Sequence, residues 1–255
     1  MPFKLKYWVN LSLLNWDQLS KNPKAIDLLK ENLHKINWDN LSLNYNAIEI
    51  LRENKEKINW RLLSANPNAL ELLKENPNKI NWEYLSKNTN PDVINLLKKN
   101  LHKINWHYLA SNPIAVELLK ANPHKIDWYY LSLNPNKEAI KLLRENPDKI
   151  DWYYLSLNDS EDAIELLKEN LNKINWSNLS ENKNAIELLM KNPDKINWYF
   201  LSLNPNAYEL IKENYYKLNM NNLSENPCAI NLLENCKSDI NWYILSTNSA
   251  IFELV

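Results

Sequence analysis

The residues that could bind a metal ion recur at one fixed position in separate copies of a repeated segment. His34, His102 and His124 each stand just before a Lys-Ile-Asn/Asp-Trp segment. No Cys-x-x-Cys or His-Glu-x-x-His spacing occurs in the chain, although zinc sites depend on such local spacings. We therefore interpret these histidines as solvated loop residues and predict no metal site.

Carboxylates recur in the same way, in the middle of a predicted helix and on the side away from its apolar stripe. They are Glu71, Glu117, Glu165, Glu187 and Glu209. With lysines three residues further on, such as Lys74 and Lys168, they form ordinary helix pairs. Acid–base catalysis requires a cleft and two carboxyl groups in unlike environments. Repeated exposed positions provide neither, so we predict no catalytic residues.

The chain contains no glycine. Phosphate-binding loops, dinucleotide-binding turns and nucleophile elbows all use glycine where the backbone bends sharply or approaches a ligand. These motifs are therefore absent from the sequence. We predict that the protein is not an enzyme and has no cofactor.

A lysine stands immediately before nine of the repeated Ile/Leu-Asn/Asp segments. These lysines are Lys35, Lys57, Lys79, Lys103, Lys125, Lys149, Lys173, Lys195 and Lys217. Stacked repeats would align them along one edge, where they could contact a phosphate backbone. The candidate phosphate contacts are Lys79, Lys103, Lys125, Lys149, Lys173 and Lys195. The alternative is that each lysine follows a helix C-terminus, where a cation suits the helix dipole. Acidic neighbours and a net charge of −1 favour this second interpretation.

Aromatic residues gather at positions predicted to face outward in the central repeats. In the terminal repeats these positions are polar, as at Asp17 and Asn221. The predicted contact surface comprises Tyr108, Tyr129, Tyr130, Leu133, Tyr153, Tyr154, Leu157, Tyr199, Phe200 and Leu203. Exposed aromatic surface usually marks a binding site, and tyrosine is enriched at interfaces. The alternative is that adjacent helices bury these side chains against one another.

The elements that position these residues follow from a tryptophan repeat. Its members are Trp16, Trp38, Trp60, Trp82, Trp106, Trp128, Trp152, Trp176, Trp198 and Trp242, with Met220 in the one position that lacks Trp. The spacing is 22 residues, with three steps of 24. Such a period predicts a stacked array in which each unit buries its apolar face against its neighbours.

One repeat predicts two short helices. Asn59 would cap a helix that begins at Trp60, and Asn66 with Pro67 would begin a second helix with an apolar stripe. Asn76 would end this helix in a left-handed conformation, since Asn tolerates that conformation better than most residues. In the 24-residue copy at Trp128, either Asn134 or Asn136 could be the second cap.

These patterns predict an all-α fold: an α-solenoid of about eleven helix-turn-helix repeats of 22–24 residues, forming a curved superhelical rod. The whole chain, 1–255, would be a single repeat domain, with an atypical N-terminal cap at 1–14, repeats at 15–248 and an incomplete terminal helix at 249–255. The Trp, Leu and Ile positions would form its core. A leucine-rich repeat has a similar period, but its strand requires a Leu-x-Leu alternation. The Trp-x-x-Leu-Ser step favours a helix instead.

The composition predicts an intracellular protein without a membrane span. No apolar run approaches the roughly 20 residues that a transmembrane helix needs. The first residues lack the features of a signal peptide. Cys228 and Cys236 stand too far apart along one predicted helix for a disulfide, which fits a reducing compartment. The chain ends on an apolar segment without a polar cap, which predicts end-to-end association, a missing continuation or fraying.

The repeat Ile-Asn-Trp-x-x-Leu-Ser-x-Asn-Pro-x-Ala-Ile-x-Leu-Leu-x-x-Asn-Pro, as in residues 58–77 with Leu at 62 and 70, resembles the short tryptophan-containing repeats of proteins from amoeba-infecting giant viruses. The resemblance covers nearly the whole chain. It implies a viral repeat protein in the host cytoplasm and brings no catalytic residues. We expect a non-enzymatic scaffold that binds a protein or peptide partner. The alternatives are a nucleic-acid-binding solenoid, which uses the lysines and stacks bases on tyrosines, and a self-assembling structural protein.

Overall fold

The computed structural model describes residues 3–255, which form two compact units. Unit 1 contains residues up to 72 together with 198–255, and unit 2 contains 73–197. Each repeat begins with a short helix at the Trp position. These first helices are α1 (Trp16–Leu19), α3 (Trp38–Leu43), α5 (Trp60–Leu63), α7 (Trp82–Leu85), α9 (Trp106–Ala110), α11 (Trp128–Ser132), α13 (Trp152–Leu157), α15 (Trp176–Glu181), α17 (Trp198–Leu201), α19 (Met220–Glu225) and α21 (Trp242–Leu245).

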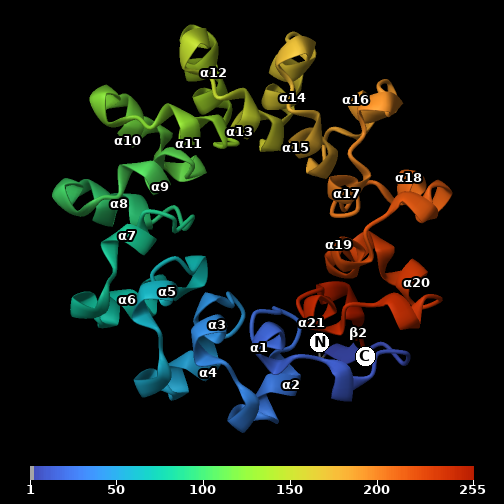
Figure 1. Cartoon of the computed structure of the whole chain (residues 1–255). Coiled ribbons are helices and arrows are strands. Elements are labelled where there is room, and N and C mark those ends of the chain that lie inside the picture. Colours follow the sequence, from blue (N-terminus) through green and yellow to red (C-terminus); the bar gives the residue numbers. More distant parts are fainter. Residues whose placement is uncertain (1–2) are drawn as a thin grey trace. The chain divides into compact units, whose positions relative to one another are not determined.

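A second helix follows in each repeat except the last. The second helices are α2 (Ile26–Lys30), α4 (Ile48–Glu53), α6 (Leu70–Glu75), α8 (Val93–Lys98), α10 (Val116–Lys120), α12 (Lys137–Glu145), α14 (Glu161–Lys168), α16 (Ile186–Met190), α18 (Tyr208–Glu213) and α20 (Ile230–Leu233). Within unit 2, α9, α11, α13 and α15 form one row on the concave side, and α10, α12, α14 and α16 form a second row outside it (Figure 1). This arrangement confirms the predicted all-α solenoid.

Short 3-10 helices connect these elements. One follows each second helix: Leu33–Lys35, Lys55–Lys57, Pro77–Lys79, Leu101–Lys103, Pro123–Lys125, Pro147–Lys149, Leu171–Lys173, Pro193–Lys195, Tyr215–Lys217 and Lys237–Asp239. Others are Leu11–Leu13, Pro67–Ala69, Pro113–Ala115, Pro227–Ala229 and Ser249–Ile251. The strands in the described residues are β1 (Phe3–Leu5) and β2 (Phe252–Leu254), so the repeats lack the strands that a leucine-rich solenoid would show.

The predicted helix caps are confirmed. The Asn59 side chain accepts a hydrogen bond from the Leu62 N–H, and Asn66 accepts one from the Asn68 N–H. Of the two possible caps of the second helix in the Trp128 copy, Asn136 is the cap, because its side chain accepts a hydrogen bond from the Glu138 N–H. Asn134 instead is buried and donates to the carbonyls of Ala110 and Asn112 in the preceding repeat.

A buried ladder of serine and asparagine side chains joins consecutive repeats. Asn158 is 2% exposed, and its Nδ2 donates to the carbonyl oxygens of Ser132 and Asn134, each at 2.9 Å. Its Oδ1 accepts from the Ser160 N–H. Ser156 Oγ donates to the Trp152 carbonyl and accepts from the Asn175 N–H. Among the described residues, every buried side-chain nitrogen or oxygen has a hydrogen-bond partner. The ladder therefore satisfies polar groups that stacking removes from water.

The prediction of a left-handed asparagine at the end of the second helix is wrong. Asn76 has φ −131° and ψ 59°, and no described residue has a positive φ. The equivalent Asn146 has φ −132°, and its Nδ2 donates to the Leu142 carbonyl at 2.9 Å. Asparagine ends the helix with its side chain rather than with an unusual backbone conformation.

We expect Asn146→Gly to lower the free energy of unfolding by about 1 kcal/mol, because it removes this hydrogen bond and frees the unfolded backbone. Urea denaturation measures the change. A glycine variant as stable as the parent chain would mean that the side-chain bond contributes nothing to the helix end.

The core is made of leucine, isoleucine and alanine. Leu131, Leu143 and Ala139 are fully buried between the two rows of helices. The repeat tryptophans, predicted to be core, are only half-buried. The sequence analysis did not predict that part of each indole would stay exposed to solvent.

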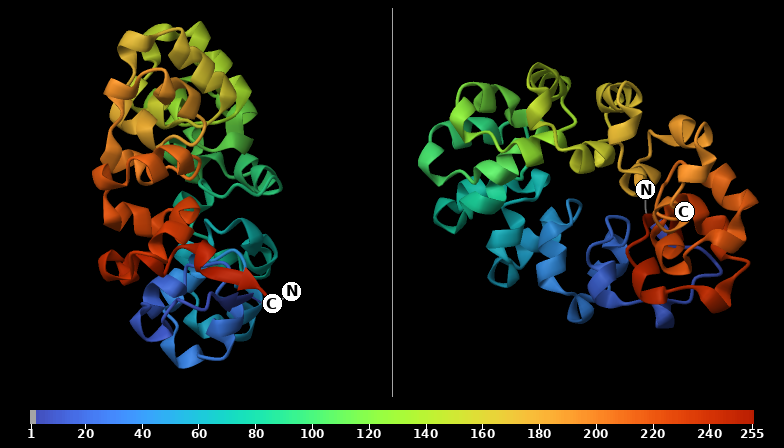
Figure 2. Two further views of the ribbon diagram at one scale, coloured as in Figure 1. Left: turned by 90° about the vertical axis from the view of Figure 1, so that its right-hand side faces the viewer. Right: turned by 45° about the horizontal axis from the view of Figure 1, so that its top comes forward.

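The two ends of the chain pair with each other inside unit 1. Strands β1 and β2 are antiparallel, with Phe3 opposite Leu254 and Leu5 opposite Phe252. Figure 2 shows the two termini next to each other in both views. Of the predicted incomplete helix at 249–255, only the 3-10 helix Ser249–Ile251 is present. From Phe252 the chain is strand β2 instead, because pairing with β1 satisfies the backbone and buries Phe252. The predicted cap at 1–14 includes Met1 and Pro2, which lie outside the described residues.

The ladder of serine and asparagine side chains also joins the last repeat to the first. The Asn15 N–H donates to Ser246 Oγ at 2.8 Å, and Asn22 Nδ2 donates to the carbonyls of Ser246 and Asn248. These are the bonds that join consecutive repeats elsewhere. The C-terminal end, predicted to be uncapped, thus stacks on the N-terminal repeat as if that repeat came next.

Candidate functional site

The predicted contact surface divides between the two units. In unit 2, seven of its residues lie on the first helices α9, α11 and α13 or directly after α11. We call them the tyrosine surface: Tyr108, Tyr129, Tyr130, Leu133, Tyr153, Tyr154 and Leu157. Tyr199, Phe200 and Leu203 belong to α17 and the residues after it in unit 1, where Tyr199 is 53% exposed.

Position within the helix decides how far each tyrosine is exposed. Tyr129 and Tyr153, which directly follow the Trp, are 62% and 54% exposed. Tyr130 and Tyr154, one residue further on, are half-buried, as are Leu133 and Leu157. The surface therefore has an exposed row beside a partly packed row. Burial by neighbouring helices, the alternative interpretation, therefore applies in part to Tyr130 and Tyr154, whereas Tyr129 and Tyr153 remain exposed.

Tyr154 lies at the centre of the aromatic contacts. Its ring stacks on Tyr130 with centroids 5.9 Å apart, and it meets Tyr129 and Tyr153 edge to face. Aromatic pairs of this geometry stabilise by about 0.5–1.5 kcal/mol beyond the area that they bury. In the next repeat, Asn178 occupies the position of Tyr154, and its Nδ2 donates to the Tyr153 carbonyl at 2.8 Å. Ring stacking thus replaces a side-chain hydrogen bond between repeats.

Three shallow pockets border the tyrosine surface. One of about 380 Å³ is lined by Tyr108, Tyr129, Tyr130 and Tyr154 together with His107, Asn105 and Asp127. Another of about 320 Å³ lies between Tyr108, Tyr130, Leu133 and Lys87. Lys87 places its ammonium 3.7 Å from the Tyr108 ring centroid, so one face of that ring is covered.

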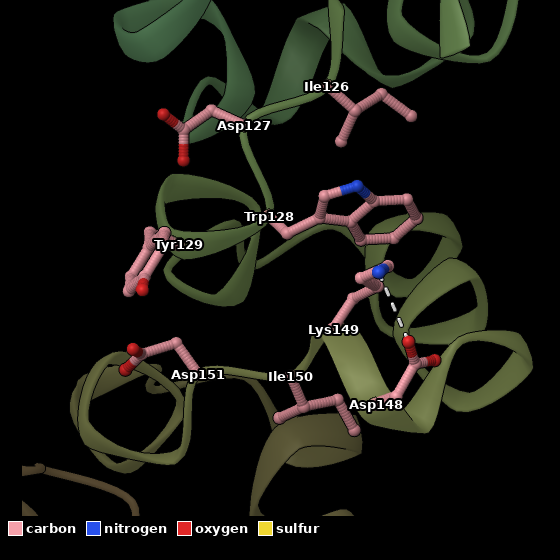
Figure 3. Close-up of a pocket in the computed structure, with 8 residues that line it drawn as sticks. All are labelled: Ile126, Asp127, Trp128, Tyr129, Asp148, Lys149, Ile150 and Asp151. Carbon is pink, nitrogen blue, oxygen red and sulfur yellow. Dashed lines mark ion pairs between the residues drawn. The ribbon is translucent and has the colours of Figure 1, made fainter. Parts of the chain in front are cut away.

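The largest of these pockets, about 460 Å³, is lined by Ile126, Asp127, Trp128, Tyr129, Asp148, Lys149, Ile150 and Asp151. We call it the Trp128 pocket. Figure 3 shows the Tyr129 ring between the carboxylates of Asp127 and Asp151, while the Trp128 indole points to the opposite side, toward Lys149. Lys149 forms an ion pair with Asp148 at 3.2 Å on the other side (Figure 3).

Asp127 and Asp151 cap α11 and α13 at a position where most repeats have asparagine. Asp127 accepts from the Tyr130 N–H, and its other oxygen contacts His107 Nδ1. Asp151 accepts from the Tyr154 N–H at 2.8 Å. Where the cap is asparagine, its Nδ2 can bond to the preceding repeat, as Asn197 does to Ser177. Asp127 has no side-chain amide, and His107 of the preceding repeat contacts its carboxylate instead. In the repeat before Asp151, the position of His107 is occupied by Tyr129.

The lysines before each Trp segment have a role that sequence reasoning missed. Each of five covers the indole at the start of its own repeat with its ammonium, 4.4–4.7 Å from the ring centroid. The pairs are Lys35 with Trp16, Lys57 with Trp38, Lys103 with Trp82, Lys173 with Trp152 and Lys217 with Trp198. This is a cation–π contact. The recurrence of a long basic side chain at the end of each repeat that begins with a tryptophan is the sequence signal that could have predicted it.

Two of the candidate phosphate contacts are held differently. Lys149 pairs with Asp148 and Lys195 with Asp194, and neither covers its tryptophan among the contacts of the described residues. A preceding aspartate therefore draws the ammonium off the ring. Lys79 and Lys125 are exposed, and nothing in the structure explains why Lys125 leaves Trp106 uncovered.

The predicted helix pairs of glutamate and lysine are present on the outer row. Lys168 Nζ lies 2.9 Å from Glu165, and Lys120 bridges Glu117 and Glu138 of the next repeat. The hydrogen bond from Lys120 lowers the pKa of Glu138, and the bond to Glu138 raises the pKa of Lys120. These are solvent-exposed structural pairs, which contribute little each.

The groups with metal-binding or nucleophilic chemistry remain dispersed. Residues 3–255 contain no group of three or more histidine, cysteine, aspartate or glutamate side chains that could hold a metal ion. Both cysteines are free thiols, and burial raises the pKa of Cys228. Burial, together with a hydrogen bond to Cys236, raises the pKa of Tyr215 to about 12. Neither change favours a reactive anion at neutral pH.

We found no match to this chain among protein-family models, curated proteins or solved structures. Over residues 3–255, none of the helices is both long enough and apolar enough to cross a bilayer. The tyrosine surface and the pockets beside it are therefore the features from which a function can be argued.

Proposed function

We propose that this protein is a non-enzymatic repeat scaffold that holds a protein or peptide partner on the tyrosine surface. The observation that carries this proposal is the exposure of Tyr129 and Tyr153 on neighbouring first helices, beside pockets lined with further aromatic rings. Tyrosine combines a large apolar ring with a hydrogen-bonding hydroxyl, and it dominates many binding hot spots.

The packing beneath these rings supports recognition. Tyr154 contacts both Tyr129 and Tyr153, so the exposed rings rest on a half-buried one. A surface held in place before binding loses less conformational entropy when a partner arrives. The concave row of α9, α11 and α13 would then receive a short segment of the partner. Because the repeat resembles those of giant-virus proteins, we propose the host cytoplasm as the site of this interaction.

The test is a variant in which Tyr129 and Tyr153 become serine and Tyr130 and Tyr154 become asparagine. These are the residues that the chain itself carries at Ser177 and Asn178, so the repeat fold should be retained, which circular dichroism would verify. We expect a partner captured from eukaryotic host lysate by the parent chain to bind the variant at least about tenfold more weakly, the loss expected from one or two hot spots. Equal binding by both proteins would contradict the proposal.

Nucleic-acid binding is the main alternative, and the same experiment separates it from the proposal. Lys103 and Lys173 cover tryptophans, and Lys149 and Lys195 pair with aspartates, so these four ammonium groups already have partners. Capture that disappears after nuclease treatment and weakens steeply with salt would favour nucleic acid. For the third possibility, self-assembly, the sign would be a molecular mass that rises with concentration.

A further inference from the structure

The tryptophans of this chain show which chemical group their exposed face accepts. In five repeats the ammonium of the lysine at the end of the repeat lies within 4.7 Å of the ring centroid. An indole attracts a cation through the negative potential of its face, and the attraction grows where water is partly excluded. The repeat is therefore a cation-binding element, which its own lysine fills in these five copies.

Among the contacts of the described residues, no lysine ammonium covers the Trp128 ring. Lys149 pairs with Asp148 instead, and Trp128 lines the pocket of about 460 Å³. Trp176 has also lost its lysine, since Lys195 pairs with Asp194 in the same way. Its neighbours, however, are Asn175, Ser177 and Asn197, where the Trp128 pocket has Asp127, Tyr129 and Asp151. Unit 2 thus contains two tryptophans without a covering lysine: Trp128 with acidic and aromatic neighbours, and Trp176 with uncharged polar ones at the same positions.

The charges of the Trp128 pocket favour a cation. Three carboxylates, Asp127, Asp148 and Asp151, line it together with one ammonium, that of Lys149. Asp127 also contacts His107, and Asp148 is paired with Lys149. Asp151 uses one oxygen to cap α13, and among the described residues no side chain forms an ion pair with it. Its carboxylate lies next to Tyr129, on the side of the pocket opposite Asp148 (Figure 3).

We propose that the Trp128 pocket binds the side-chain ammonium of a lysine carried by the partner. The cation would lie over the Trp128 face, against Tyr129, and pair with Asp151. This inference rests on the proposed function, because the pocket shares Tyr129 with the tyrosine surface. It identifies the partner segment as one with a lysine that enters the pocket while neighbouring residues contact Tyr153 and Tyr154.

The probe is a capped five-residue peptide with lysine at its centre and glycine elsewhere, titrated into the full chain at low salt. Binding is followed by the indole N–H resonance of Trp128, which a Trp128→Phe variant assigns. We expect a saturable shift of this resonance, and about fivefold weaker binding to Asp151→Asn, from the loss of one charge pair next to the ring. Asparagine is the residue of this position in most repeats, so the variant should fold normally.

Three controls sharpen the result. A peptide with norleucine in place of lysine should not shift Trp128, and the Trp176 indole should not respond to the lysine peptide. Lys149→Met, which removes the competing ammonium, should strengthen binding. Equal shifts at Trp128 and Trp176, or equal binding of the norleucine peptide, would overturn the inference. If the peptide fails while the tyrosine variant still loses its partner, the scaffold function stands and only the lysine pocket is wrong.

Discussion

Replacing Asn158 with aspartate is expected to lower the free energy of unfolding by about 4 kcal/mol, because it leaves a buried charge without a partner. The aspartate keeps the oxygen that accepts from the Ser160 N–H. It loses the Nδ2 donor to the Ser132 and Asn134 carbonyls and places a carboxylate 2.9 Å from both. Because Asn158 is 2% exposed, water cannot replace the lost bonds. Chemical denaturation followed by circular dichroism measures the loss.

The matched control is Asn175→Asp. Asn175 is a cap at the edge of the stack, and two other repeats naturally carry aspartate there, at Asp127 and Asp151. Aspartate can still accept the Asn178 N–H, so we expect a change within about 0.5 kcal/mol. Equal losses from both substitutions would mean that the ladder contributes no more than an ordinary helix cap.

Phe252→Ala should lower the free energy of unfolding by about 3 kcal/mol, as phenylalanine truncations in cores do. Phe252 is 4% exposed and lies opposite Leu5 in the pair of strands that joins the two chain ends. Because the strand pair belongs to unit 1, hydrogen exchange should speed up at Phe3–Leu5 and in α1. The amides of α11 and α13 in unit 2 should exchange as before.

Leu254→Ala provides the comparison for Phe252→Ala on the same strand. Leu254 is 58% exposed and lies opposite Phe3, so its truncation removes little buried surface. We expect a loss within about 0.5 kcal/mol. Faster exchange throughout both units after Phe252→Ala would show that the chain ends stabilise more than the unit to which they belong.

The fold was predictable because it depends on local signals that recur. Trp at each helix start, Asn at each cap and the apolar stripe all agree, and each repeat needs only its neighbours. The end of the second helix was not predictable from propensity alone. Asn146 could have taken a left-handed backbone, and it instead donates its side-chain amide to Leu142. Both uses suit the residue, and only the geometry decides between them.

The pairing of the chain ends had no local signal. Phe252 and Leu5 are ordinary apolar residues, and their sequence gives no sign that they face each other. The candidate site was predictable in its aromatic content but not in its exposure. Tyr129 and Tyr130 read alike in the sequence, yet stacking on Tyr154 half-buries only Tyr130. The Trp128 pocket was missed because the sequence does not show whether the Lys149 ammonium pairs with Asp148 or covers Trp128.

The pairing of β1 with β2 also bears on the order in which the protein can fold. Unit 1 draws on both ends of the chain, whereas unit 2 is one continuous segment, 73–197. During synthesis the first repeat emerges well before Ser246 and Phe252, on which the start of α1 and β1 pack. Contacts of such high sequence separation carry a large loop-closure entropy and form slowly. We therefore expect unit 2 to fold while the chain is still being made. The first repeat should reach its final packing only after the repeat at Trp242 has been synthesised.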